Sequence, residues 1–104
     1  MEAITIMQNN GQSVTIPAVI IGQYAAHKRH NRDGWQVTHI ATGHGVAQEY
    51  GRFLTTESKA IAFASVMADK LDMSMVKTPA DVRLIDRRKA RIAAYLAHRA
   101  AMKA

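Results

Sequence analysis

The stretch that decides the fold is Trp35-Gln36-Val37-Thr38-His39-Ile40-Ala41-Thr42, in which successive side chains point to opposite faces. One face takes the odd-numbered residues of this stretch and the other takes the even-numbered ones, the period of a β-strand. Gly43-His44-Gly45 then reverses the chain. The sequence therefore predicts a further strand over residues 46–50, ended by Gly51.

Two strands are expected before this one. Residues 3–7 form a short β-prone run. The sequence Asn9-Asn10-Gly11 that follows is typical of a tight hairpin turn, because an Asn-Gly pair readily adopts positive φ. Residues 13–26 are rich in Val and Ile and predict one long second strand. Pro17 lacks a backbone donor, which places it at an edge or a bulge. The expected unit is an antiparallel four-stranded β-meander over residues 1–51.

The second half predicts two helices. Thr55-Thr56-Glu57 offers a threonine N-cap with an acid in the first turn, opening a helix over residues 55–71. Thr78-Pro79-Ala80-Asp81 combines a cap, a proline at the first helical position and an acid, opening a helix over residues 79–103. With 104 residues, 48% of them hydrophobic, the chain predicts a single α+β domain over residues 1–104.

The last predicted helix is amphipathic. On an ideal wheel of 100° per residue its arginines occupy one broad face, and Asp86 is the single acid that could partly quench them. Lys89 falls inside the opposite, apolar stripe. That stripe predicts the buried face, formed by Val82, Ile85, Ile92, Ala93, Leu96 and Ala100.

Basic residues cluster in two places. The chain has 14 Lys and Arg against 8 Asp and Glu, a net charge of +6, and residues 79–104 alone carry +5. A smaller cluster, residues 27–32, falls in the expected loop between the second and third strands. Arginines one helical turn apart can contact successive phosphates of a nucleic-acid backbone. The alternative is a solvated helix face that serves solubility alone.

Other classes of function find no support in the sequence. The absence of cysteine excludes disulfides and thiolate sites, and no apolar run reaches the length of a membrane span. The first residues lack a secretory signal, so we expect a cytoplasmic protein. No nucleophile is paired with a base at a recognisable spacing, and the five histidines have no supporting carboxylate. We therefore expect neither an enzyme nor a metal or cofactor site.

The stretch from Gly34 to Gly43, followed by Phe53-Leu54-Thr55-Thr56-Glu57-Ser58-Lys59-Ala60, resembles the hairpin-plus-helix of many small accessory proteins encoded by phages and plasmids. The resemblance covers about a third of the chain and its motifs are structural. It implies a mobile-element context, and with it the cytoplasm of a host cell. Such proteins include nucleic-acid binders and inhibitors of host enzymes or defence complexes, among them anti-CRISPR-like inhibitors.

Two hypotheses follow. The first is a small basic protein that binds DNA or RNA by clamping phosphates between the last helix and the basic loop. The second is a protein-interaction factor whose basic surface fits an acidic host protein. A homodimer is a further alternative, because helices on one face of the sheet would leave its other face uncovered. The residues predicted to contact nucleic acid are Arg83, Arg87, Arg88, Arg91 and Arg99 of the helix and Lys28, Arg29 and Arg32 of the loop.

Overall fold

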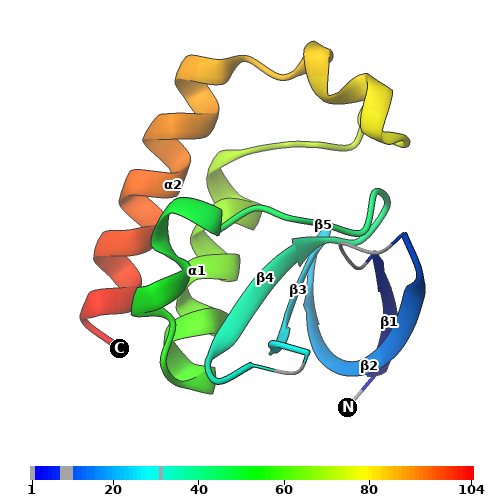
Figure 1. Cartoon of the computed structure of the whole chain (residues 1–104). Coiled ribbons are helices and arrows are strands. Elements are labelled where there is room, and N and C mark those ends of the chain that lie inside the picture. The colour runs from blue at the N-terminus through cyan, green and yellow to red at the C-terminus, as the bar shows by residue number, and fades with distance from the viewer. Residues whose placement is uncertain (1, 8–10, 31) are drawn as a thin grey trace.

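The computed structural model describes residues 2–7, 11–30 and 32–104 and shows an antiparallel sheet followed by helices, which confirms the α+β class. The sheet has five strands in the order β1-β2-β3-β4-β5. Figure 1 shows the sheet curled at one side of the molecule, with the helices stacked on the other. The elements are β1 (Glu2–Met7), β2 (Ser13–Ile21), β3 (Tyr24–Lys28), β4 (Trp35–His39), β5 (His44–Gly45), the 3-10 helices η1 (Gln48–Phe53) and η2 (Pro79–Leu84), and the α-helices α1 (Glu57–Lys70) and α2 (Arg87–Met102).

The long second strand predicted over residues 13–26 is two strands. Gly22 adopts a φ of +59°, a conformation that a side chain disfavours, and the chain turns there to pair Ile21 of β2 with Tyr24 of β3. The hairpin predicted between the first two strands is confirmed by the pairing of Met7 with Ser13. Asn9 and Asn10 of its predicted turn lie outside the described residues.

The prediction of a strand over residues 46–50 was wrong. The backbone N–H of Val46 still donates to Val37 at 2.9 Å, but the chain then winds into η1. The aromatic side chains of this segment explain the change, because Tyr50 packs against Phe63 of α1 and stacks on His98 of α2, with ring centroids 6.2 and 4.5 Å apart. Packing against the helices therefore outweighs a further pair of strands.

The sheet curls so that its first hairpin folds over part of the face that the helices do not cover. Between residues 13 and 18, β2 pairs with β1, whereas its last three residues pair with β3. The curl closes a small core in which Ile4 and Ile6 of β1 pack with Ala18 and Ala25. The chain's own first hairpin therefore covers part of the face that we expected to be uncovered, whereas the outer side of that hairpin, with Ala3, Thr5 and Thr15, is exposed. The homodimer stays a prediction.

The main core lies between the sheet and α1. Thr56 caps this helix, as predicted, by accepting a hydrogen bond from the Lys59 N–H at 3.2 Å. Fully buried Phe63 packs in this core, which partly buried Trp35 contacts from β4. Buried Tyr24 of β3 donates its hydroxyl hydrogen to the Leu71 carbonyl at 2.9 Å, which fixes the end of α1 against the sheet.

The helix predicted over residues 79–103 is interrupted. Asp81 accepts hydrogen bonds from the N–H groups of Lys77 and Thr78 at 3.1 Å each, but the helix that it opens is the single 3-10 segment η2, ending at Leu84. Asp86 then accepts from the N–H groups of Arg88 and Lys89 and acts as the N-cap of α2. Asp86 is thus a helix start rather than a partner for the arginines.

The buried face of α2 differs from the predicted stripe. Ala93, Ala97 and Ala101 are its buried residues, and α2 packs on α1 rather than on the sheet. The small side chains let the two helices approach closely, and buried Ala60 and Ala64 of α1 belong to the same core. Of the predicted stripe, Ala93 alone is buried; Val82, Ile92 and Leu96 are exposed, and Ile85 and Ala100 are half-buried. Lys89, predicted inside the stripe, is exposed.

Within the described part of the chain, no helix combines the length and the apolar character needed to cross a membrane.

Candidate nucleic-acid interface

All of the net charge of the protein resides on α2 and the two residues after it. Residues 87–104 carry six basic and no acidic side chains, whereas residues 1–86 carry eight of each. The first 86 residues are therefore neutral overall, and five of the six charges belong to α2, with Lys103 directly after it. Four of its charges fall within Arg87–Arg91, beside a helix N-terminus whose dipole adds positive potential.

The cations of α2 are not neutralised within the protein. Among the described residues, which include every Lys and Arg, the one ion pair joins Lys70 and Asp69 at 3.4 Å. The six basic residues after Asp86 are exposed. Exposed and unpaired guanidinium groups are available for bidentate contacts with phosphate oxygens.

The break before α2 removes one residue from the predicted arginine face. Arg83 is exposed on η2 and no longer continues the face of α2. Arg87 and Arg91 remain one turn apart, and Arg88 and Arg99 point from the outward side of the same helix. The helix therefore brings together Arg87, Arg88, Arg91 and Arg99 of the predicted set.

The basic loop lies at the other end of α2. Next to that loop, the backbone N–H of Trp35 donates to the Leu54 carbonyl at 2.8 Å, and Leu54 lies three residues before the start of α1. At that start Lys59 donates to the carbonyl of Ala101, near the end of α2. Figure 1 shows the β3–β4 loop and the C-terminus at the same end of the molecule.

This placement sets the two parts of the predicted clamp apart along α2. About a dozen residues of helix, or roughly 18 Å, separate the first turn of α2 from the end beside the loop. The loop therefore lies near the end of α2 that carries Arg99, and away from Arg87 and Arg91. Lys28 and Arg32 are exposed, whereas Arg29 is half-buried.

The outward face of α2 also carries large apolar side chains. Ile92 and Tyr95 each expose about half of their surface, at 51% and 52%. The Arg99 guanidinium lies over the Tyr95 ring, 5.9 Å from its centroid. Leu96 continues the strip at 37% exposure. Apolar side chains among unpaired cations are typical of a contact surface rather than of a purely solvated helix face.

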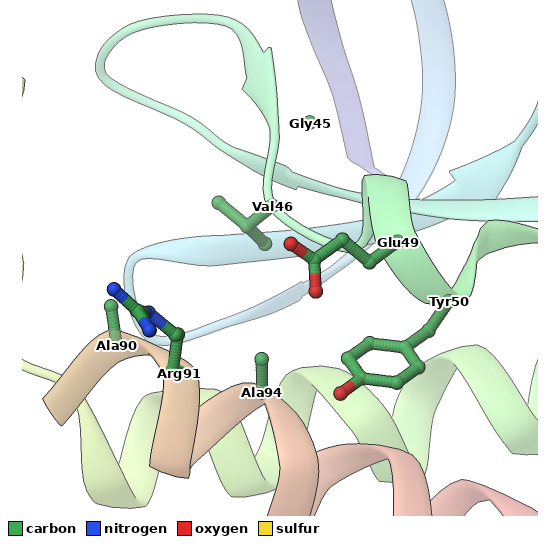
Figure 2. A pocket seen from close by; sticks show the side chains of 7 residues that line it. All are labelled: Gly45, Val46, Glu49, Tyr50, Ala90, Arg91 and Ala94. Atoms are coloured by element: carbon green, nitrogen blue, oxygen red, sulfur yellow. The ribbon is translucent and has the colours of Figure 1, made fainter. Parts of the chain in front are cut away.

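A small pocket opens between η1 and the first half of α2. Its volume is about 260 Å³, and it is lined by Gly45, Val46, Glu49, Tyr50, Ala90, Arg91 and Ala94. Figure 2 shows the Glu49 carboxylate and the Tyr50 hydroxyl extending from η1 toward α2, which presents Ala90, Arg91 and Ala94 on the facing side. The pocket therefore joins the basic surface of α2 to a carboxylate and a hydroxyl group.

Two histidines are buried as neutral parts of the sheet. The Nδ1–H of His27 donates to the Lys28 carbonyl at 2.8 Å, so Nε2 accepts from the Thr38 hydroxyl at 2.7 Å. His39 Nδ1 lies 3.0 Å from the Thr42 hydroxyl. No cluster of three His, Asp or Glu side chains with metal-binding geometry occurs in the described ranges.

Acid should destabilise the protein through these histidines. Burial lowers the pKa of His27, an effect that the Lys28 carbonyl partly opposes, and burial also lowers the pKa of His39. The unfolded chain therefore binds protons first as the pH falls below about 6.5. We expect the free energy of unfolding, measured with urea, to fall from pH 7 to pH 5.5 by up to about 1.4 kcal/mol per histidine for each pH unit.

Two variants test the assignment of this pH dependence. His27→Gln should reduce the slope of stability against pH, whereas His30→Gln, in the exposed loop, should leave it unchanged. An equal slope in the wild type and in His27→Gln would show that His27 is not the responsible group.

Comparison of the chain with protein-family models, with curated proteins and with solved structures gave no match. The candidate interface therefore depends on the geometry of this chain alone. Sequence reasoning missed Glu49 and Tyr50, because it placed them at the end of a strand. The signal that could have revealed them is the aromatic pair Tyr50 and Phe53 at a spacing of three, which suits a helical turn better than a strand.

Proposed function

We propose that the protein binds nucleic acid through the exposed cations of α2. The observation that carries the proposal is that a chain neutral over its first 86 residues concentrates its whole charge of +6 on α2 and Lys103, where all six basic side chains are exposed and form no ion pair with the described residues. Arg87, Arg88 and Arg91 contact phosphates near the start of the helix, and Arg99 extends the contact toward its end. Such contacts release counterions and give binding that is sensitive to salt and largely independent of sequence.

Fluorescence anisotropy of labelled duplex DNA, single-stranded DNA and RNA tests the proposal. With three or four phosphate contacts we expect micromolar or tighter binding, with log K falling against log salt with a slope of about −2 to −4. Absence of binding to all three probes near physiological salt would contradict it.

A protein partner is the second candidate, favoured by the exposed strip of Ile92, Tyr95 and Leu96. Phosphate groups gain nothing from contact with apolar side chains. An acidic protein surface that also carries apolar side chains would contact both the strip and the arginines around it. Under this candidate function the protein would inhibit a host enzyme or a defence complex by binding to it. It predicts weak, unselective binding of nucleic acid and loss of the protein complex in Ile92→Ser with Leu96→Ser.

A further inference from the structure

The pocket between η1 and α2 combines groups that would suit a single nucleotide. Glu49 of η1 and Arg91 of α2 line it together, and neither forms an ion pair among the described residues. The Tyr50 hydroxyl likewise has no hydrogen-bond partner in the described part of the chain. Val46, Ala90 and Ala94 supply apolar walls. A carboxylate, a hydroxyl and a guanidinium thus surround an apolar space without being used by the fold.

The size and charge of the pocket limit its occupant. At about 260 Å³ the pocket is smaller than the roughly 300–1,000 Å³ of sites for drug-sized ligands, so the occupant has about the size of one nucleobase. Arg91 favours an anionic group beside the pocket. Glu49 would repel a phosphate, so the carboxylate needs a neutral group that donates hydrogen bonds.

We propose that this pocket accepts one unpaired base of the bound nucleic acid, and that Glu49 selects guanine. The inference rests on the proposed function and names the substrate class of the same site, which is single-stranded nucleic acid. The Watson–Crick edge of guanine carries two adjacent donors, N1–H and the 2-amino group, which match the two oxygens of a carboxylate. Unpaired bases are commonly recognised through this edge. Arg91 binds the phosphate next to the base, and the Tyr50 hydroxyl offers a further hydrogen bond.

Adenine and cytosine each offer a carboxylate one amino group on this edge, beside an acceptor nitrogen that faces the other oxygen. Thymine and uracil offer a single N–H flanked by two carbonyl oxygens. Duplex DNA has this edge of each base occupied by pairing, so the pocket distinguishes an unpaired strand from a duplex.

The experiment measures binding of single-stranded thymine octamers with one central substituted base. The four probes carry guanine, hypoxanthine, adenine or cytosine, and hypoxanthine differs from guanine by the loss of the 2-amino group. We expect the wild type to bind the guanine octamer about tenfold more tightly than the hypoxanthine octamer, the loss expected for one hydrogen bond to a charged group.

Glu49→Gln should reduce this preference to about twofold or less, because an amide presents one acceptor and one donor group. Its overall affinity should be maintained or increased, since a negative charge has left the basic surface. Glu57→Gln is the matched control: it removes the same charge from the start of α1, outside the pocket, and should keep the guanine preference.

The possible failures are distinguishable. Equal binding of the four octamers by the wild type, or an unchanged guanine preference in Glu49→Gln, would overturn the base pocket and leave phosphate binding by α2 standing. Absence of binding to any octamer and to duplex DNA would overturn the proposed function and this inference together.

Discussion

Reversing the charge of Arg87 and Arg91 should abolish most nucleic-acid binding while the fold survives. Loss of two phosphate contacts lowers the affinity by about 30-fold at 0.15 M salt through counterion release alone, and the two new carboxylates add repulsion. The slope of log K against log salt should become shallower by about two. Both side chains are exposed, and an acid in the first turn of α2 suits the helix dipole, so Arg87→Glu with Arg91→Glu should unfold at nearly the wild-type temperature.

A second double variant provides the matched control. Lys28→Glu with Arg32→Glu changes the net charge by the same amount, at the end of β3 and in the loop that follows it, near the far end of α2. We expect this variant to lose far less affinity than the α2 variant. Equal losses in the two variants would mean that binding follows net charge rather than the surface of α2.

Placing an acid in the alanine face of α2 should cost most of the stability of the protein. Ala97 of α2 is fully buried and belongs to the main core. Aspartate at this position would be an unpaired buried charge, which destabilises a fold by about 3–5 kcal/mol. For a chain of this size that loss is a large fraction of the total free energy of unfolding. We therefore expect Ala97→Asp to be largely unfolded in circular dichroism near 37 °C.

The control for this prediction is Ile92→Asp, on the outward face of the same helix. Ile92 is half-exposed, so the change should cost no more than about 0.5–1 kcal/mol, mainly from the lower helix propensity of aspartate. The predicted stripe from the sequence placed Ile92 in the core, and a severe loss in Ile92→Asp would restore that placement.

Local signals in the sequence predicted much of the fold. The alternation that begins at Trp35, the turn after Met7 and the threonine cap depend on near neighbours, and the structure contains β4, the first hairpin and α1 accordingly. The predicted strand over residues 35–42 is shorter than expected: β4 ends at His39, residues 40–43 form the turn, and His44 and Gly45 of the predicted reversal form β5. The predictions failed where distant contacts decide. Tyr50 lies in η1 rather than in the predicted strand, because it packs on Phe63 and His98, which lie 13 and 48 residues further along the chain.

The orientation of α2 shows the same limit. The sequence suggested that Ile92 and Leu96 would be buried because they lie in the apolar stripe of the helical wheel, opposite the arginines. The structure buries alanines instead, since the close approach of α1 and α2 favours small residues at their contact. Which face of an amphipathic helix is buried depends on its partner, and α2 packs on α1 rather than on the sheet.

For the candidate interface, the sequence showed that the basic residues are concentrated near the C-terminus. It did not show that some of the predicted site residues are separated from α2. The break at Asp86 separates Arg83 from α2, and the position of the β3–β4 loop separates Lys28, Arg29 and Arg32 from the first turn of α2. The pocket between η1 and α2 joins residues more than 40 positions apart. A sequence pattern alone does not bring such residues together.

The central claim is that the first half of α2 is the nucleic-acid surface, and amide chemical-shift mapping tests it most directly. Titration of the ¹⁵N-labelled protein with a guanine-containing thymine octamer should shift the backbone signals of Arg87–Arg91 and of Gly45–Tyr50 across the pocket. Signals of η2 and of the β3–β4 loop should remain nearly unchanged. Shifts confined to the loop, or no shifts at millimolar octamer in low salt, would contradict the account.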